Sequence, residues 1–129
     1  KALEYYTGAL GFKKVTDPIE VPTQHVRVCF LDGGSGVYVE LVEGIGAGSP
    51  VEGLLSHTGG GPYHLCFRVP DLDAAIARLR GQGFFRLKRF ELAAHGMRRF
   101  AFMLTPDRQL FELCEPDRGS ADAHQKKDA

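Results

Sequence analysis

The stretch YHLCFRVPDLDAA, at residues 63–75, is the part of the sequence that decides the fold class. Its first part is apolar and typical of a strand over residues 62–69. Asp71 is a typical helix N-cap residue, and the apolar residues after it recur at helical spacing, which predicts a helix over residues 72–80. Three further strands are then expected, at residues 84–90, 99–104 and 110–114. The second half of the chain is therefore predicted to be a β-α-β-β-β unit.

The first half of the chain shows the same order of elements without the opening strand. Helical spacing of apolar residues predicts a helix over residues 2–10, which ends at Gly11. Strands are expected at residues 12–16, 25–31 and 37–42, and the last two are joined by a glycine-rich turn. Residues of one type recur 72 positions later: Gly11 and Gly83, Phe12 and Phe84, Phe30 and Phe102, Glu40 and Glu112, Leu41 and Leu113, Glu43 and Glu115. One constant offset across several elements indicates an internal duplication.

The duplication predicts a single α+β domain over residues 1–116, made of two β-α-β-β-β units. Unit one covers residues 1–43, a linker covers 44–61, and unit two covers 62–116. Unit one lacks its first strand, and an empty position there would leave a sheet edge bare. We therefore expect about a dozen residues before Lys1 in the protein, or else a strand from another chain. The polar, aperiodic residues 117–129 are expected to form a disordered tail.

Composition limits the kinds of partner. Sixteen basic and sixteen acidic residues cancel, and neither sign forms a block that would favour binding to nucleic acid or to an anionic membrane. No apolar run has the length of a membrane span, and no signal peptide is visible. The cysteines Cys29, Cys66 and Cys114 lie far apart in apolar segments, so they are interpreted as reduced core residues of a cytoplasmic protein. A small molecule is the expected partner.

Two glutamates and one histidine are the candidate chemical groups. Glu40 and Glu112 occupy the same position of the duplicated unit, each between apolar neighbours on the face expected to point inward. A buried carboxylate is costly unless it is paired or binds a cation. With His64 from a third strand, these residues form an oxygen and nitrogen ligand set for one divalent metal ion, for which cobalt, manganese, nickel and zinc are equally suited. Glu115 lies on the opposite strand face, and its replacement is expected to have little effect on metal content or turnover.

Three segments resemble methylmalonyl-CoA epimerases of the vicinal oxygen chelate superfamily: residues 46–55, residues 63–75 and the loop Ala94-His95-Gly96. The resemblance implies that the two units form a U-shaped mixed sheet around a metal ion. It also implies ligands from the first and last strands of each unit, which correspond here to His64, Glu112 and Glu40. The fourth ligand, a histidine, belongs to the absent first strand, about eight to ten residues before Lys1 if the repeat symmetry holds.

The same resemblance implies a metal-dependent epimerase or isomerase that removes a proton next to a carbonyl group, as on methylmalonyl-CoA or a similar acyl thioester. Glu112 and Glu40 are the candidate catalytic bases, and His95 is a candidate substrate contact. Short members of the superfamily commonly pair, so a homodimer is expected.

Two departures from the epimerase pattern are visible. Residues 104–109 form a shorter turn than the His-Pro-Lys segment common in epimerases, which weakens the coenzyme A assignment. No acidic residue lies in residues 26–30, where some epimerases carry a proton-transfer group, so one base is unassigned. The alternatives are a glyoxalase-type lyase acting on a thiol adduct and a metal-free protein that binds a small molecule. Metal analysis separates the binding protein from the enzymes, and turnover of methylmalonyl-CoA separates the two enzymes.

Overall fold

A computed structural model describes residues 1–91 and 97–116, and the side chains of these residues except those of 88–91 and 97–98. The chain forms two compact units, Lys1–Pro62 and Tyr63–Ala129, and each is described by itself. The predicted tail, residues 117–129, and the predicted substrate contact His95 lie outside the described residues. No helix in the described part is long and apolar enough to cross a membrane.

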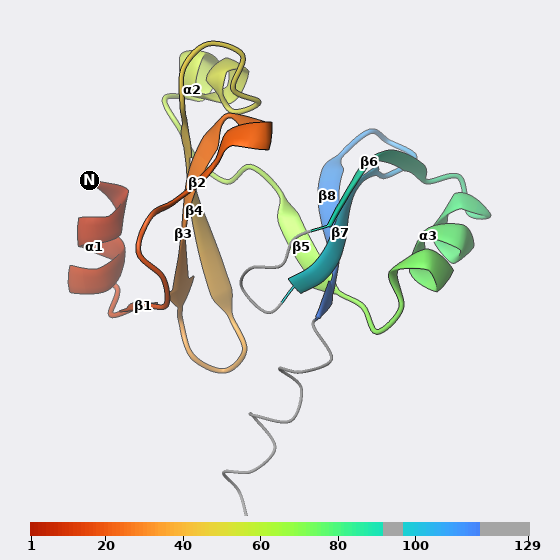
Figure 1. Cartoon of the computed structure of the whole chain (residues 1–129), viewed down its shortest axis with the longest axis horizontal. Coiled ribbons are helices and arrows are strands. Elements are labelled where there is room, and N and C mark those ends of the chain that lie inside the picture. Colours follow the sequence, from red (N-terminus) through yellow and green to blue (C-terminus); the bar gives the residue numbers. More distant parts are fainter. Residues whose placement is uncertain (92–96, 117–129) are drawn as a thin grey trace, which may run out of the picture. The chain divides into compact units, whose positions relative to one another are not determined.

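The first unit contains a four-stranded antiparallel sheet with two α-helices (Figure 1). Its elements are α1 (Ala2–Gly8), β1 (Lys13–Lys14), β2 (Ile19–Val21), a short 3-10 helix (Pro22–Gln24), β3 (Val26–Asp32), β4 (Tyr38–Gly44) and α2 (Glu52–Thr58). β3 pairs with β1, β2 and β4, and among the described residues β4 pairs with β3 only. Among the described residues, no strand of the first unit occupies the position beside β4 that β5 (Leu65–Arg68) has beside β8 (Leu110–Pro116).

The second unit contains a mixed four-stranded sheet in the order β5-β8-β7-β6. Its elements are β5 (Leu65–Arg68), α3 (Leu72–Arg80), β6 (Phe85–Glu91), β7 (Met97–Leu104) and β8 (Leu110–Pro116). β5 runs parallel to β8, and the other pairs are antiparallel. The α+β class, the mixed pairing and the β-α-β-β-β order are confirmed.

The duplication extends to the hydrogen-bond register. In the first unit, β3 and β4 pair from Arg27↔Glu43 to Asp32↔Tyr38, and every one of these pairs recurs 72 residues later between β7 and β8, from Arg99↔Glu115 to Leu104↔Leu110. Glu40 faces Phe30 across its ladder just as Glu112 faces Phe102. The two glutamates therefore occupy equivalent positions in their sheets, and not only in the sequence.

One strand of the first unit was not predicted. The expected strand at residues 12–16 is cut short after Lys14, and β2 pairs with the same partner strand further along. Pro18 lies between the two pieces and has no N–H group to donate to the ladder. β6, the counterpart in the second unit, continues through a register shift between Arg86 and Lys88, where no proline interrupts it.

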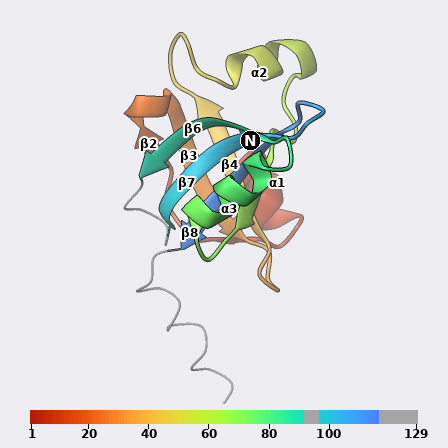
Figure 2. The ribbon, with the colours of Figure 1, turned by 90° about the vertical axis from the view of Figure 1, so that its right-hand side faces the viewer.

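The core of the second unit lies between α3 and one face of its sheet. Figure 2 shows α3 lying across β7 and β8, and the buried residues that meet there are Leu72, Ala75, Ile76, Ala101, Met103, Phe111 and Leu113. The alternation of side chains along β8 leaves Glu112 on the other face of the sheet. The packing of α3 therefore determines which face of β8 carries the candidate site.

Asp71 starts α3 as the sequence predicted. Its side chain accepts a hydrogen bond of 2.9 Å from the backbone N–H of Ala74. We expect Asp71→Ala to lower the free energy of unfolding by about 1 kcal/mol, because one N–H group of the first helical turn loses its acceptor. Chemical denaturation measures the difference. Asp17→Ala, which removes an exposed carboxylate that caps no helix, is the control and should cost less. An equal loss in both variants would contradict the capping role.

Glu115 has a structural role that the sequence did not suggest. It is 3% exposed, and its Oε2 accepts hydrogen bonds from the backbone N–H of Leu72 at 3.2 Å and from Arg99 at 2.6 Å. Arg99 also donates to Asp73, and these two partners hold the pKa of Arg99 above its usual range. Its carboxylate joins the start of α3 to β7 and β8, so we expect its replacement to destabilise the fold. The expectation that its replacement leaves metal binding unchanged stays a prediction.

Candidate metal-binding site

The candidate site of the second unit lies where β5 runs beside β8. Cys66 pairs with Glu112 in this parallel ladder, so His64, two residues before Cys66, comes next to the start of β8. The side chains of Glu112 and Cys114 both project from the face of β8 that α3 does not cover, since Phe111 and Leu113 belong to the core on the other face. The local fold thus collects polar groups from two strands on one face of the sheet.

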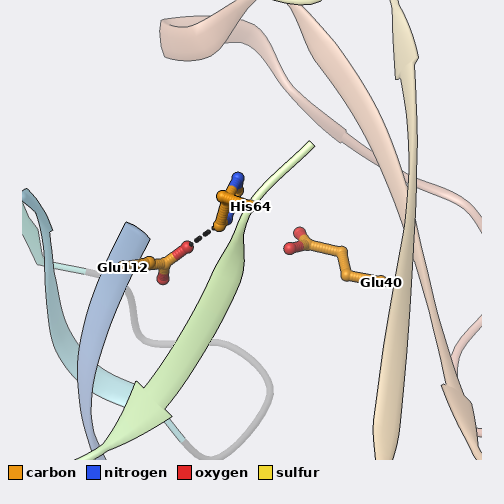
Figure 3. A group of neighbouring side chains, drawn as sticks. All are labelled: Glu40, His64 and Glu112. Atoms are coloured by element: carbon orange, nitrogen blue, oxygen red, sulfur yellow. Dashed lines mark hydrogen bonds and ion pairs between the residues drawn. The ribbon is translucent and has the colours of Figure 1, made fainter. Parts of the chain in front are cut away.

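His64 and Glu112 form a buried pair. Nε2 of His64 lies 2.9 Å from Oε2 of Glu112, and the two side chains are 10% and 7% exposed. Figure 3 shows the imidazole and the carboxylate pointing toward one another. The predicted proximity of these two residues is present in the structure. A carboxylate this deeply buried needs such a partner, or a cation in its place.

The pair offers two kinds of ligand atom that a divalent cation takes, an imidazole nitrogen and a carboxylate oxygen. The distance between His64 Nε2 and Glu112 Oε2, 2.9 Å, is that of a hydrogen bond. His64 Nδ1 is also buried and has no hydrogen-bond partner among the described residues. A ring nitrogen in this state is a further possible metal ligand or donor to a bound group.

Phenylalanine rings form an apolar wall next to the pair. Phe102, which pairs with Glu112 across the β7–β8 ladder, meets the His64 ring edge-on with ring centroids 5.2 Å apart. Phe100 in turn contacts Phe102 at 5.9 Å between centroids. The wall restricts rotation of the imidazole and lowers the local dielectric, which strengthens the attraction between a carboxylate and a cation. The sequence interpretation missed Phe102, although its position opposite Glu112 follows from the repeat.

Glu40 lies on β4 in the first unit, and Figure 3 shows its side chain extending from that strand. It is exposed, whereas its repeat counterpart Glu112 is 5% exposed. The expected burial is therefore confirmed for Glu112 and wrong for Glu40. In the second unit, β5 lies beside β8 and covers Glu112. Among the described residues of the first unit, no such strand lies beside β4, so Glu40 is left uncovered.

Two cysteines extend the polar face of the second sheet. A hydrogen bond from Cys66 lowers the pKa of the Cys114 thiol, against the opposing effects of burial and of the nearby Glu112 charge. Cys114 and Cys29 are buried as predicted, but Cys66 is exposed. The interpretation of Cys66 as a core residue is therefore wrong, because β5 is the edge strand of its sheet.

The comparisons with known proteins agree with the fold. A family model described as the glyoxalase/bleomycin resistance protein/dioxygenase superfamily matches residues 1–102. Human mitochondrial methylmalonyl-CoA epimerase is 31% identical over 98 residues, which are 74% of this chain and 54% of the human protein. The chain thus spans about half the length of this relative.

A bacterial relative and a solved structure are similar over more of their length. The ethylmalonyl-CoA/methylmalonyl-CoA epimerase of Cereibacter sphaeroides is 35% identical over 98 residues, 74% of this chain and 72% of the relative. The crystal structure of methylmalonyl-CoA epimerase from Mycobacterium tuberculosis superposes with a TM-score of 0.79 at 30% identity, covering 95% of this chain and 83% of that one.

Proposed function

Because the chain belongs to the glyoxalase/bleomycin resistance protein/dioxygenase superfamily, we propose that it is a metal-dependent epimerase of 2-substituted malonyl-CoA thioesters, with methylmalonyl-CoA as the first substrate to test. The observation that carries the proposal is the buried His64–Glu112 pair, on the face of the sheet that the helix leaves open. The relatives support the substrate class, since their names specify methylmalonyl-CoA or ethylmalonyl-CoA.

The proposed ligands are Glu40, His64 and Glu112, each of which offers one ligand atom. Glu40 is included because it repeats Glu112 in the register of the first unit. Carboxylate and imidazole ligands suit cobalt, manganese, nickel or zinc. These three side chains would hold a divalent ion and would leave coordination positions open for a substrate.

The proposed reaction inverts the carbon between the two carbonyl groups of the substrate. The chemistry supplied by a bound divalent metal is Lewis-acid stabilisation of negative charge on the substrate oxygens. Glu112 and Glu40 are the proposed proton acceptors, because both carboxylates would lie next to the chelated substrate. The Phe102 ring packs edge-on against the His64 imidazole and would limit access of water to a bound substrate from that side.

Inversion requires a proton to leave one face of the carbon and to return to the other. Residues 26–30 contain no acidic side chain that could act from the first unit. Among the described residues, Glu40 and Glu112 are therefore the two carboxylates proposed to transfer the proton. If a single glutamate removed and returned the proton, the substrate would exchange its proton with solvent without forming the second epimer. Two glutamates acting from opposite faces would form the second epimer.

The test is incubation of one epimer of methylmalonyl-CoA with the cobalt-loaded protein in D₂O. We expect deuterium at the carbon between the carbonyls and appearance of the second epimer, both lost after chelation and restored by added metal. Exchange without the second epimer would show proton removal from one face only. Absence of exchange, with turnover of a hemithioacetal instead, would favour a glyoxalase-type activity. Tight binding without metal or turnover would indicate a binding protein.

A further inference from the structure

We propose that Cys66 and Cys114 form a reversible disulfide between β5 and β8, and that this bond controls how well the neighbouring His64–Glu112 pair retains a cation. The first part rests on the second unit alone. The second part rests on the proposed function, since it requires the pair to bind a metal.

The two thiols lie on neighbouring strands and on the same face of the sheet. Cys66 pairs with Glu112, and Arg68 pairs with Cys114, so the cysteines are diagonal neighbours in the parallel ladder. The Cys66 side chain is also the main cause that lowers the pKa of the Cys114 thiol, as expected for neighbouring side chains.

The two thiols differ in exposure, and a peroxide-sensitive pair requires one thiol that solvent reaches and a second thiol beside it. Cys66 is exposed on the edge strand β5, whereas Cys114, on the neighbouring strand β8, is buried. An oxidant from solvent therefore reaches Cys66 first, and Cys114 is positioned to resolve the product. Cys29, in the other unit, is buried, and its Sγ donates to the carbonyl oxygen of Thr16, so it is not exposed to the same reaction.

The oxidant that the proposal names is a peroxide. The sulfur of Cys66 attacks one peroxide oxygen, the O–O bond breaks, and Cys66 becomes a sulfenic acid with release of water. The sulfur of Cys114 then attacks the sulfur of Cys66, the S–O bond breaks, and a second water leaves with the remaining thiol proton. In total, two thiols and one hydrogen peroxide give one disulfide and two waters. A dithiol reductant reverses the bond.

Closing the bond must move β5 along β8. Diagonal neighbours in a sheet have Cα atoms about 7–8 Å apart, which is longer than the usual distance of about 4.4–6.8 Å across a disulfide. His64 directly precedes β5, and Glu112 lies on β8 two residues before Cys114. A shift that draws the thiols together therefore changes the distance between the two proposed ligands. The strained bond is also easily reduced, which makes the change reversible.

The experiment treats the purified chain with hydrogen peroxide and measures its intact mass, its free thiols and its peptide map without reduction. We expect loss of two hydrogens, a decrease in free thiols from the three of the reduced chain to one, and a peptide that links Cys66 to Cys114. Dithiothreitol should restore the mass and the thiols. Cys66→Ser, at an exposed position, should abolish the link, and Cys29→Ser should retain it.

Other products would overturn the proposal. Addition of oxygen atoms without a cross-link would show that Cys114 does not resolve the sulfenic acid. A disulfide between Cys66 residues of two chains, seen as a dimer on a non-reducing gel, would show that the thiols react separately.

The coupling to metal is read from the cobalt content of the chain before and after oxidation. We expect oxidation to lower cobalt content at least severalfold in the parent protein and to have no effect in Cys66→Ser. A disulfide that forms without change in cobalt content would overturn the control of metal binding. A chain that forms the disulfide but binds no cobalt even when reduced would refute the proposed function and leave the disulfide established.

Discussion

Glu112→Gln should leave the fold intact, lower metal affinity by roughly tenfold or more, and lower the epimerisation rate by at least about 100-fold. The amide has the shape of the carboxylate and still accepts a hydrogen bond from His64, whose Nε2 lies 2.9 Å from Oε2 of Glu112 in the parent protein. It brings no negative charge to a cation, and at 5% exposure of Glu112 water screens little of this loss. An amide also cannot accept the substrate proton, so the rate should decrease more than the affinity.

The control for this change is Glu43→Gln on β4. Glu43 is exposed, and its carboxylate forms an ion pair of 3.1 Å with Arg27 on the surface of the first unit. Both variants remove one carboxylate and preserve its volume, but only the first removes a proposed ligand. Metal content and rate are measured for both beside the parent protein. Equal metal content in all three would show that the His64–Glu112 pair is only a buried hydrogen bond, and the enzymatic proposal would lose its main support.

The order of elements could be predicted because each helix and strand is a local consequence of the sequence. Helix α3 has its cap residue and apolar stripe within a few positions of one another, and the structure places it at Leu72–Arg80, as predicted. The offset of 72 residues, noted first for single residues such as Glu40 and Glu112, applies to the whole ladder of strands. A repeat constrains register because a slip by one residue would turn every side chain to the other face.

The burial of individual groups could not be predicted, because it depends on which elements cover a strand. Alternation along β4 predicted which residues share a face with Glu40. It could not predict that Glu40 itself is exposed. The same argument mistook Cys66 for a core residue, since a strand at a sheet edge resembles a central strand in its sequence. Periodicity identifies the faces of a strand, and only the topology shows what lies against each of them.

The role of Glu115 was missed for a related reason. Its partner Leu72 is 43 residues away in the sequence, and the contact exists only because α3 begins at the end of β8 where Glu115 lies. Alternation correctly put Glu115 and Glu112 on opposite faces. The face with Glu115 is the core face, however, and a carboxylate there must be satisfied by specific donors.

Glu115→Ala should therefore lower the free energy of unfolding by about 2–3 kcal/mol, because the buried N–H group of Leu72 loses its acceptor at the start of α3. Arg99 loses one of its two carboxylate partners in the same change and keeps only Asp73. The repeat provides a matched control in Glu43→Ala, which removes the equivalent carboxylate at an exposed position of the first unit, where Arg27 also keeps a second partner, Glu20.

Urea denaturation of the two variants tests whether burial of the carboxylate, and not its position in the repeat, determines its contribution to stability. Exposed ion pairs contribute little to stability, so Glu43→Ala should lower the transition midpoint far less than Glu115→Ala.

The metal content of Glu115→Ala, measured at a temperature where the variant is folded, should stay close to that of the parent, because Glu115 projects from the face opposite Glu112. Equal destabilisation by both substitutions would mean that the two ion pairs act alike despite their different burial. A loss of metal in folded Glu115→Ala would mean that the position of α3 determines the geometry of the His64–Glu112 pair.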